Sequence, residues 1–301
     1  MLKLITKILL ILFISVILLC IIFINTNYRK LKYNNFIKYI NRGILINNLI
    51  NNCINNYVLF TIWIGDNDLT TNRYKGLMSI KNSNKINMIN VNPHNLHLFI
   101  KEKYPIHKAF KYLSVIHKSD YLRCYLMHHW GGGYSDIKPH KNIDKWYPLF
   151  DKIKYDDNIW AIGNTDSHSI EFPDDGDDKL RKEYANNKDK MIGVAYMIYR
   201  PYTKLTSDWY NKLHEKLDYH YPILKDNPAV YTREAFDRIP SRWCKDERDI
   251  RILHKKCPKE KTKYPIKWTE ILGQINCPIQ LKYLKHISNQ IPDLKVYGGY
   301  G

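Results

Sequence analysis

The sequence predicts an α/β fold, in which one sheet-based domain follows a hydrophobic N-terminal segment. Three observations support this prediction. Short runs of β-branched and aromatic residues alternate with longer segments of helical spacing. The chain has 301 residues, 45% of them hydrophobic, which is enough for one sizeable core. A long uninterrupted apolar run occurs only near the N-terminus. We therefore expect a single folded domain over residues 58–301.

The N-terminal segment is predicted to anchor the chain in a membrane. After a short tail, residues 1–7, residues 8–24 are mostly Ile, Leu, Val and Phe. A spanning helix needs ~17–25 apolar residues. No small-residue cleavage site follows, which favours a single-pass signal anchor over a cleaved signal peptide. Lys3 and Lys7 favour a Golgi- or ER-like type II orientation, whereas four basic residues at positions 29–38 favour the opposite one.

Residues 25–57 form an Asn-rich segment, which we interpret as a stem between the anchor and the domain. The formal net charge is +18, and residues 1–60 contain seven Lys or Arg but no acidic residue. A basic chain can meet nucleic acid, anionic lipid or a phosphorylated substrate. No nucleic-acid-binding module or dense basic stripe occurs in the predicted domain, so we expect no nucleic-acid partner.

The six cysteines form no CxxC pair, which disfavours a zinc ribbon. Cys244 and Cys257 are candidates for a disulfide, and free thiols are equally compatible with their spacing.

The predicted domain opens with a strand over residues 58–64, a continuous apolar run that ends at Gly65. A second strand is predicted over residues 87–91. Residues 94–103 and 109–130 are predicted to be helical. Residues 171–189 are acidic and turn-rich and are predicted to form a mobile loop. Further along, we predict a strand over residues 192–199 and a helix over residues 204–219, where Leu205, Trp209, Leu213 and Leu217 recur at helical spacing.

The most informative stretch runs from Ser119 to Asp136. In the predicted helix, one apolar stripe should face the core, with Asp120 and Arg123 on a neighbouring face; the stripe consists of Val115, Ser119, Leu122, Leu126 and His129. Gly131 is placed to end this helix, since glycine adopts the left-handed conformation of a helix C-cap. After the Gly131–Gly133 turn, residues 134–137 are predicted to form a short strand. Asp136 falls near its carboxyl end, where open α/β sheets bind ligands.

Each part of this stretch also has a purely structural interpretation. An Asp and an Arg three residues apart on a helix usually form a solvated ion pair worth a few tenths of a kcal/mol. Consecutive glycines after a helix usually form a turn, and a single Asp after a strand is often a cap. The order and spacing of all three together are much more specific than any one alone.

The stretch resembles the "DXD-motif" sugar transferases, a family that includes yeast-type initiating α-1,6-mannosyltransferases, capsular polysaccharide synthesis proteins and glucosylating toxins. Their pattern is Ser-Asp-x-x-Arg, an apolar helix, and Gly-Gly-x-Tyr-x-Asp-x-Asp. The matching residues are Ser119, Asp120, Arg123, Gly132, Gly133 or its neighbour, Tyr134 and Asp136. Ile62-Trp63-Ile64-Gly65 is similar to the family's first strand. The resemblance covers residues 58 to about 145.

The resemblance implies a GT-A-type, Rossmann-like domain that binds a nucleotide sugar. It implies a hexosyltransferase-like enzyme that uses a UDP- or GDP-linked donor, acts on a glycan or glycoprotein acceptor, and usually retains the anomeric configuration. Trp63 would stack near the base. Asp120, Arg123 and Tyr134 would contact the donor. Asp136 would bind ribose or a divalent metal, Mn or Mg, beside the diphosphate.

One departure from the family affects the metal. Lys138 stands where the family has its second Asp. Either a metal persists with another ligand, for which His140, Asp226 and Glu247 are candidates, or Lys138 itself supplies the charge that the leaving diphosphate needs. Asp136 and Lys138 are therefore the predicted catalytic residues. The substitution also raises the alternative of a family member that binds nucleotide sugar or glycan without transfer.

Overall fold

A computed structural model describes residues 15, 17–18, 43–65, 69–165, 171–238 and 261–291 of the chain. The chain divides into two units, residues 1–42 and residues 43–301. The predicted tail, 1–7, and the predicted anchor, 8–24, lie outside the described residues except for Ser15, Ile17 and Leu18. Within the described ranges, no helix is long and apolar enough to cross a membrane.

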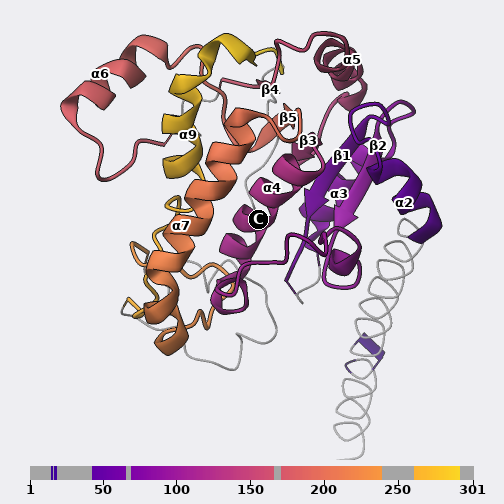
Figure 1. The fold of residues 1–301 in the computed structure, drawn as a ribbon. Helices are drawn as coiled ribbons and strands as arrows, with labels where there is room; N and C mark the ends of the chain where they lie inside the picture. Colours follow the sequence, from indigo (N-terminus) through magenta and orange to yellow (C-terminus); the bar gives the residue numbers. More distant parts are fainter. Residues whose placement is uncertain are drawn as a thin grey trace, which may run out of the picture. The chain divides into compact units, whose positions relative to one another are not determined.

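The second unit has a mixed α/β fold built on a six-stranded sheet, as the sequence predicts at this level (Figure 1). The strand order is β2-β1-β3-β5-β4-β6. The pairs β1–β2, β1–β3 and β4–β6 are parallel, whereas β5 runs antiparallel to both of its neighbours. The described strands are β1 (Val58–Ile62), β2 (Asn87–Val91), β3 (Gly132–Ser135), β4 (Ala161–Gly163), β5 (Tyr196–Tyr199) and β6 (Ile287–Ser288).

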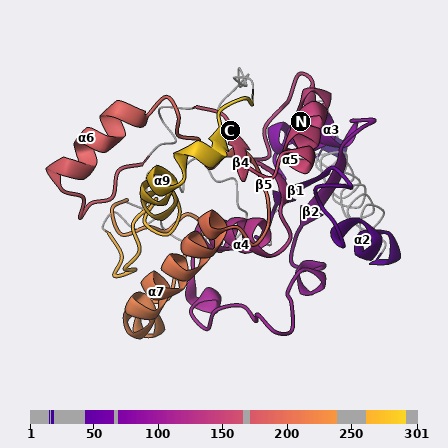
Figure 2. The same ribbon diagram turned by 45° about the horizontal axis from the view of Figure 1, so that its top comes forward.

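Helices lie on both faces of the sheet, with α3 and α5 on one side and α4 and α7 on the other (Figure 2). The described α-helices are α2 (Gly43–Ile50), α3 (Thr71–Lys81), α4 (Val115–His129), α5 (Tyr147–Tyr155), α6 (Asp178–Asn187), α7 (Lys204–Asp226) and α9 (Gly273–Lys282). Four short 3-10 helices connect them: η1 (Leu96–Leu98), η2 (Phe110–Tyr112), η3 (Ile143–Trp146) and η4 (Leu284–His286).

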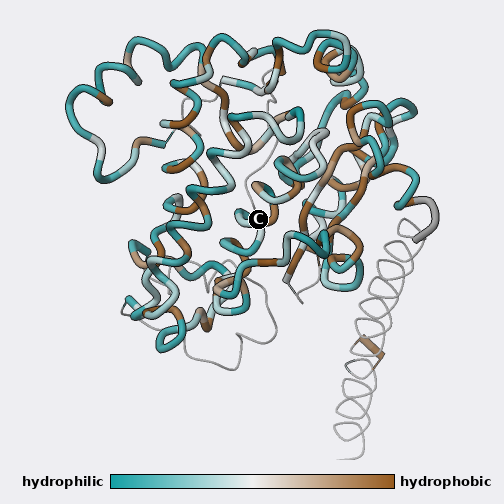
Figure 3. Tube along the Cα trace, viewed as in Figure 1, coloured by the Kyte–Doolittle hydropathy of each residue, from teal (hydrophilic) through white to brown (hydrophobic). Residues whose placement is uncertain are grey.

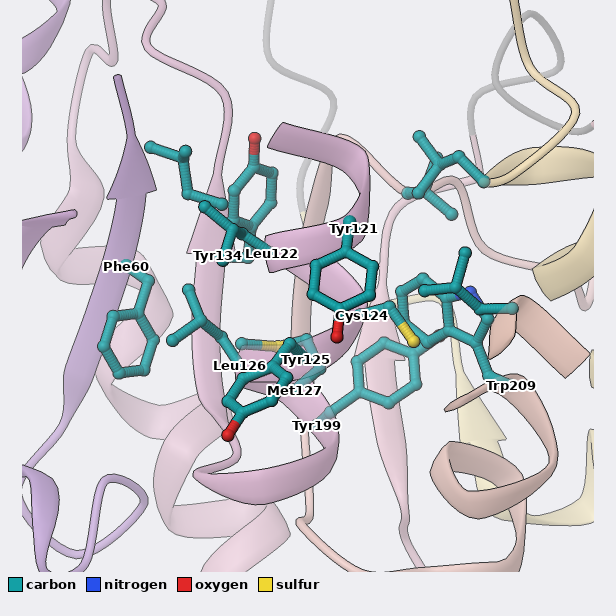
Figure 4. Packing of buried hydrophobic residues seen from close by; sticks show 14 of the residues in the cluster. Phe60, Tyr121, Leu122, Cys124, Tyr125, Leu126, Met127, Tyr134, Tyr199 and Trp209 are labelled. Atoms are coloured by element: carbon teal, nitrogen blue, oxygen red, sulfur yellow. The ribbon is translucent and has the colours of Figure 1, made fainter. Parts of the chain in front are cut away.

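The main core is centred on α4, which lies between the sheet and α7 (Figure 4). Phe60 of β1 packs on the sheet side of α4 and Trp209 of α7 on the other, and both side chains are fully buried. Hydrophobic residues predominate along β1 and β2, whereas α6 is largely hydrophilic (Figure 3). Burial of these large side chains removes apolar surface from water, the dominant favourable contribution to folding.

Several predicted elements are confirmed. β1 and β2 occupy the predicted positions, the latter with the same bounds. α7 includes the whole of the predicted helix 204–219, continues through Pro222, and buries all four residues of the predicted leucine and tryptophan series. The compact unit begins at Gly43, so α2 belongs to it although the stem was expected to extend to residue 57. Ile46 and Ile50 of α2 are part of the main core.

Other predictions are wrong in instructive ways. Only η1 forms within the predicted helix 94–103, because asparagine side chains bind the local backbone instead: the Asn92 side chain accepts a hydrogen bond from the His94 N–H, and Asn95 accepts one from the Asn92 N–H. The predicted loop 171–189 contains α6, whose first turn is capped by the Asp177 carboxylate. β5 is shorter than predicted, because the Ile192 N–H donates to the Gln280 side chain rather than to a neighbouring strand.

The helix that carries the motif also differs from its prediction. It begins at Val115 with Ser114 as N-cap, and η2 precedes it. A single apolar stripe was expected, yet every residue from Asp120 to His129 is buried. The reason is its position between the sheet and α7, which leaves no solvent face along this length.

Candidate functional site

The candidate site lies where the chain order of the sheet reverses. β1 lies between β2 and β3 in the sheet. After β1 the chain therefore adds β2 on one side of β1, and then crosses over to add β3 on the other side. Because the three strands are parallel, their carboxyl ends share one edge. Trp63 directly follows β1 and Asp136 directly follows β3. Open α/β sheets bind ligands beyond the carboxyl ends of their strands at such a switch point.

Two glycines allow the chain to turn from α4 into β3. Gly131 has φ of +64° and its N–H donates to the Leu126 carbonyl, so it ends the helix as predicted, directly after the C-cap residue Trp130. Gly132 has φ of +85°, and a Cβ at this position would lie 2.8 Å from the Val58 carbonyl oxygen. The turn directs β3 back along α4, so that Asp136 meets Arg123, thirteen residues earlier in the sequence.

The Asp136 carboxylate is held by two other residues of the predicted site. Its Oδ1 accepts hydrogen bonds from Tyr134 Oη at 3.0 Å and from Arg123 Nη2 at 3.3 Å. The Arg123 guanidinium also lies over the Tyr134 ring, 4.3 Å from the ring centroid. Its Nη1 donates to the Val194 carbonyl at 2.8 Å. Arg123 therefore links α4, the end of β3 and the segment that leads into β5.

Asp120 completes this buried network from the first half of α4. Its Oδ1 lies 3.6 Å from Arg123 Nη2, and the two residues are only 4% and 7% exposed. Burial is the main cause that raises the pKa of Asp120 to about 7; the Arg123 guanidinium opposes this shift, and the charge on Asp136 adds to it. The solvated ion pair that sequence reasoning allowed as an alternative is therefore wrong for this pair.

Lys138 faces the other oxygen of the same carboxylate. Its Nζ lies 3.9 Å from Asp136 Oδ2 and 5.6 Å from the centroid of the Tyr196 ring. Its side chain is 17% exposed, as is that of Asp136, whereas Asp120 and Arg123 are more deeply buried. Asp136 and Lys138 therefore form the part of the network that is most open to a ligand.

Trp63 lies at the same edge of the sheet, at the end of the neighbouring strand. It is half-buried, and its backbone N–H donates to the Val91 carbonyl at the end of β2. The structure thus brings Asp120, Arg123, Tyr134, Asp136 and Lys138 into one connected network and places Trp63 beside it.

The side chain of His140, the candidate second metal ligand nearest to Asp136 in the sequence, contacts Ser135 and Trp146 instead. Its Nε2 lies 2.8 Å from Ser135 Oγ, and its ring packs edge-on against Trp146. Strand alternation places Ser135 on the sheet face opposite Tyr134 and Arg123. Burial lowers the pKa of His140 to about 4, so the ring is neutral near pH 7.

The described residues around Asp136 do not fit a divalent cation. One oxygen of the carboxylate already accepts two hydrogen bonds, and the other faces an ammonium group. Within the described ranges, no group of three or more His, Cys, Asp or Glu side chains is arranged to hold a metal ion. Asp226 is the last residue of α7, and Glu247 lies outside the described residues.

Sequence reasoning missed the contribution of α3, which contacts the loop that carries Asp136 and Lys138. Arg73 Nη1 donates to the Ile137 carbonyl at 2.6 Å. Gly76 packs so closely that a Cβ there would lie 2.8 Å from the Lys138 carbonyl carbon. Ser79 Oγ accepts a hydrogen bond from the His140 N–H at 2.8 Å. These residues are about 60 positions away in sequence, and no local pattern marks them.

Comparisons with known proteins add no further assignment. No family model, curated protein or solved structure matches the chain.

Proposed function

We propose that the protein is a glycosyltransferase that moves a hexose from a UDP- or GDP-linked donor to a hydroxyl group of a glycan or glycoprotein. The observation that carries this proposal is the buried network of Asp120, Arg123 and Asp136 at the carboxyl edge of the sheet. Burying charged groups is costly unless they are paired, and buried charges near strand ends are typical of functional sites. The resemblance of residues 119–136 to sugar transferases supports the same proposal.

The residues suit the charge changes of glycosyl transfer. As the bond between the sugar and the diphosphate breaks, the sugar gains oxocarbenium character and the diphosphate gains negative charge. Asp120 and Asp136 would orient the hydroxyl groups of the donor through hydrogen bonds. Trp63, at the end of β1, would stack on the nucleotide base. In keeping with the family resemblance, the transfer would retain the anomeric configuration.

We also propose that residues 8–24 anchor the enzyme in a Golgi- or ER-like membrane in type II orientation, which would place the domain near membrane-bound acceptors. The support for this part is the apolar sequence alone.

A ligand screen followed by a turnover assay tests the function. UDP, GDP and their hexose conjugates are added to the full chain in detergent, and the melting temperature and the release of nucleoside diphosphate are measured. One donor series should raise the melting temperature and be split slowly even without acceptor. Arg123→Lys should reduce turnover at least tenfold, because a lysine cannot reach Asp136, Asp120 and Val194 together.

A matched control comes from α7. Lys212 and Glu215 form an exposed ion pair, also three residues apart on a helix, at 2.8 Å. Lys212→Ala should leave turnover unchanged. Donor binding without any turnover would favour the alternative of a non-catalytic nucleotide-sugar-binding protein. Absence of both binding and turnover across the donor panel would overturn the proposal.

A further inference from the structure

The charges around Asp136 differ from those expected of a metal-dependent transferase. A carboxylate that binds a divalent cation needs an oxygen directed at the metal and few cations nearby. Here Arg123 Nη2 lies 3.3 Å from Oδ1 and Lys138 Nζ lies 3.9 Å from Oδ2. A divalent ion at this carboxylate would sit close to two positive side chains. The same two side chains carry N–H groups of the kind that pair with phosphate oxygens.

Lys138 is also held in place through its backbone. The Lys138 N–H donates to the Asp136 carbonyl at 2.8 Å, and the Asp136 N–H donates to the Ala195 carbonyl at 2.9 Å. On the opposite side, Gly76 of α3 packs directly against the Lys138 backbone. The start of the Lys138 side chain is therefore fixed, so less flexibility is lost when its ammonium group pairs with a ligand.

The loop is held at both ends as well. Arg73 of α3 donates to the Ile137 carbonyl, one residue before Lys138. Two residues after it, the His140 N–H donates to Ser79 Oγ, which in turn donates to the Gly76 carbonyl. Three residues of α3, at positions 73, 76 and 79, thus contact one short loop. Their spacing of three places them along one side of the helix.

We propose that Arg123 and Lys138 receive the diphosphate of the donor directly and that this enzyme needs no divalent metal for transfer. This inference rests on the proposed function. In the reaction, the bond between sugar C1 and the phosphate oxygen breaks, and its electron pair stays on that oxygen. A new bond forms between C1 and the acceptor oxygen, and the proton of that oxygen passes to the phosphate oxygen that leaves. The Lys138 ammonium pairs with the charge that develops on the diphosphate, the role that a metal ion has in other transferases. Gly76 acts as a positioning residue.

Metal dependence of turnover is the first test. Nucleoside diphosphate release by the full chain is measured in EDTA and in manganese. The inference predicts rates within about twofold of each other. Turnover that is lost in EDTA and restored by manganese would overturn the inference but leave the proposed function intact. No turnover in either medium, with any donor, would instead contradict the proposed function.

Variants of Lys138 provide a sharper test. Lys138→Arg should keep at least a tenth of the rate, whereas Lys138→Ala should lose at least a hundredfold with or without manganese. Lys138→Asp recreates the two carboxylates of the family pattern. This variant should be inactive in EDTA. It should recover activity with manganese, because its two carboxylates can then bind the metal. Full activity of Lys138→Ala in EDTA would overturn the inference.

Binding provides a readout that does not depend on turnover. The affinity of UDP and GDP is measured by calorimetry in EDTA at several salt concentrations. Lys138→Ala should weaken binding of the preferred nucleotide at least tenfold and reduce the salt dependence, because one phosphate contact is lost. Unchanged affinity and salt dependence would contradict direct contact with the diphosphate.

The positioning role of α3 is tested with a pair of glycine variants. Gly76→Ala should displace the Lys138 backbone and lower kcat at least tenfold, with a smaller effect on KM. Gly176→Ala is the control, because a Cβ at Gly176 would also be crowded, by the Phe172 ring, but Phe172 lies outside the network. Equal effects of the two variants on kcat would remove Gly76 from the mechanism. If Gly76→Ala lowers the melting temperature, Ser79→Ala, which removes only a hydroxyl group, should still lower kcat.

Discussion

The two ends of α4 bury polar side chains in contrasting ways. In its first half, Asp120 and Arg123 pair with each other and, through Arg123, with Asp136. In its last turn, His128 and His129 are just as buried but are surrounded by rings: His128 stacks on Tyr210 at 4.8 Å and His129 on Tyr104 at 4.7 Å. The first end adjoins the carboxyl edge of the sheet, and the second leads into the start of β3.

The histidine end is built to remain uncharged. Burial, with a smaller contribution from the charge of Lys101, lowers the pKa of His128 to about 4. Burial, with smaller contributions from His128, Lys101 and His214, lowers the pKa of His129 to about 3. His214 of α7 and His107 also pack into this cluster, with lowered pKa values, and Asp218 contacts His107 and Lys108 at its exposed margin. Burial alone thus does not mark a functional site. The difference is that charge is retained at one end of α4 and excluded at the other.

The largest effect should come from removing the central cation. Arg123→Met removes the cation that Asp120 and Asp136 share, leaves Asp136 with only Tyr134 and Lys138 of its described partners, and takes the donor from the Val194 carbonyl. Removing one member of a buried charge network costs about 3–5 kcal/mol, and donor turnover should also be lost. Chemical denaturation measures the first effect. Lys212→Met breaks the exposed pair of α7 and should cost less than about 1 kcal/mol. Equal losses of unfolding free energy in the two variants would show that the buried network stabilises the fold no more than an exposed ion pair does.

Acid should destabilise the protein through the two histidines in the last turn of α4. The pKa values of His128 and His129 are lower in the folded protein than the usual value of 6.5, so the unfolded chain binds more protons as the pH falls. Stability is therefore fully present above pH 6.5 and is lost as the pH falls towards 4, by at most about 1.4 kcal/mol per histidine and pH unit. Urea denaturation between pH 7.5 and 4.5 measures this slope. A flat profile would contradict it.

A smaller effect is expected from replacing one of these histidines. His129 is 1% exposed, and its Nε2 has no hydrogen-bond partner in the described structure. His129→Phe should keep the ring contacts, reduce the acid-induced loss of stability, and leave donor turnover within about twofold. The control is His286→Phe, because His286 stacks on Trp160 outside this cluster. If His129→Phe abolishes turnover while remaining folded, the histidine end is part of the site.

The smallest effect on stability concerns Asp120, whose pH dependence has the opposite sign. Its pKa is raised above the usual value of 3.8 to about 7, so the folded state favours its protonated form. This contribution is fully present below pH 3.8 and is lost as the pH rises through 7. Asp120→Asn mimics the protonated group and should raise the melting temperature slightly at pH 8 but not at pH 5, while lowering turnover about tenfold. A lower melting temperature at pH 8 would show that the charged form stabilises the fold.

Local patterns account for the parts of the fold and site that could be predicted. Residues 58–62 and 87–91 are short segments rich in β-branched and other apolar residues, which can be recognised as strands without a distant partner. Asp120, Arg123, Tyr134 and Asp136 lie within 17 consecutive positions joined by one glycine turn, so their proximity follows from a helix, a turn and a strand. The spacing of these residues in the sequence was therefore sufficient to predict that they lie close together.

The remainder depended on contacts between distant segments. The Ile192 N–H bonds to Gln280, 88 residues away, which shortens β5. In the sequence, nothing distinguishes Gly76 and Ser79 from other helical residues. Their role follows only from the packing of α3 on the loop after β3. The uniform burial of α4 results from α7 covering the face that its sequence would leave to solvent. No periodic or compositional pattern in the sequence predicts any of these three features.

The most direct test compares the two ends of α4 in one assay. Nucleoside diphosphate release from the preferred hexose donor is measured for the full chain, for Asp136→Asn and for His129→Phe under identical conditions, with the melting temperature of each. Asp136→Asn should show background rates, because it keeps the shape but not the charge that Arg123 and Lys138 face. His129→Phe should turn over donor within about twofold of the unmodified protein. Wild-type turnover by a folded Asp136→Asn would show that the Asp136 carboxylate is not part of an active site.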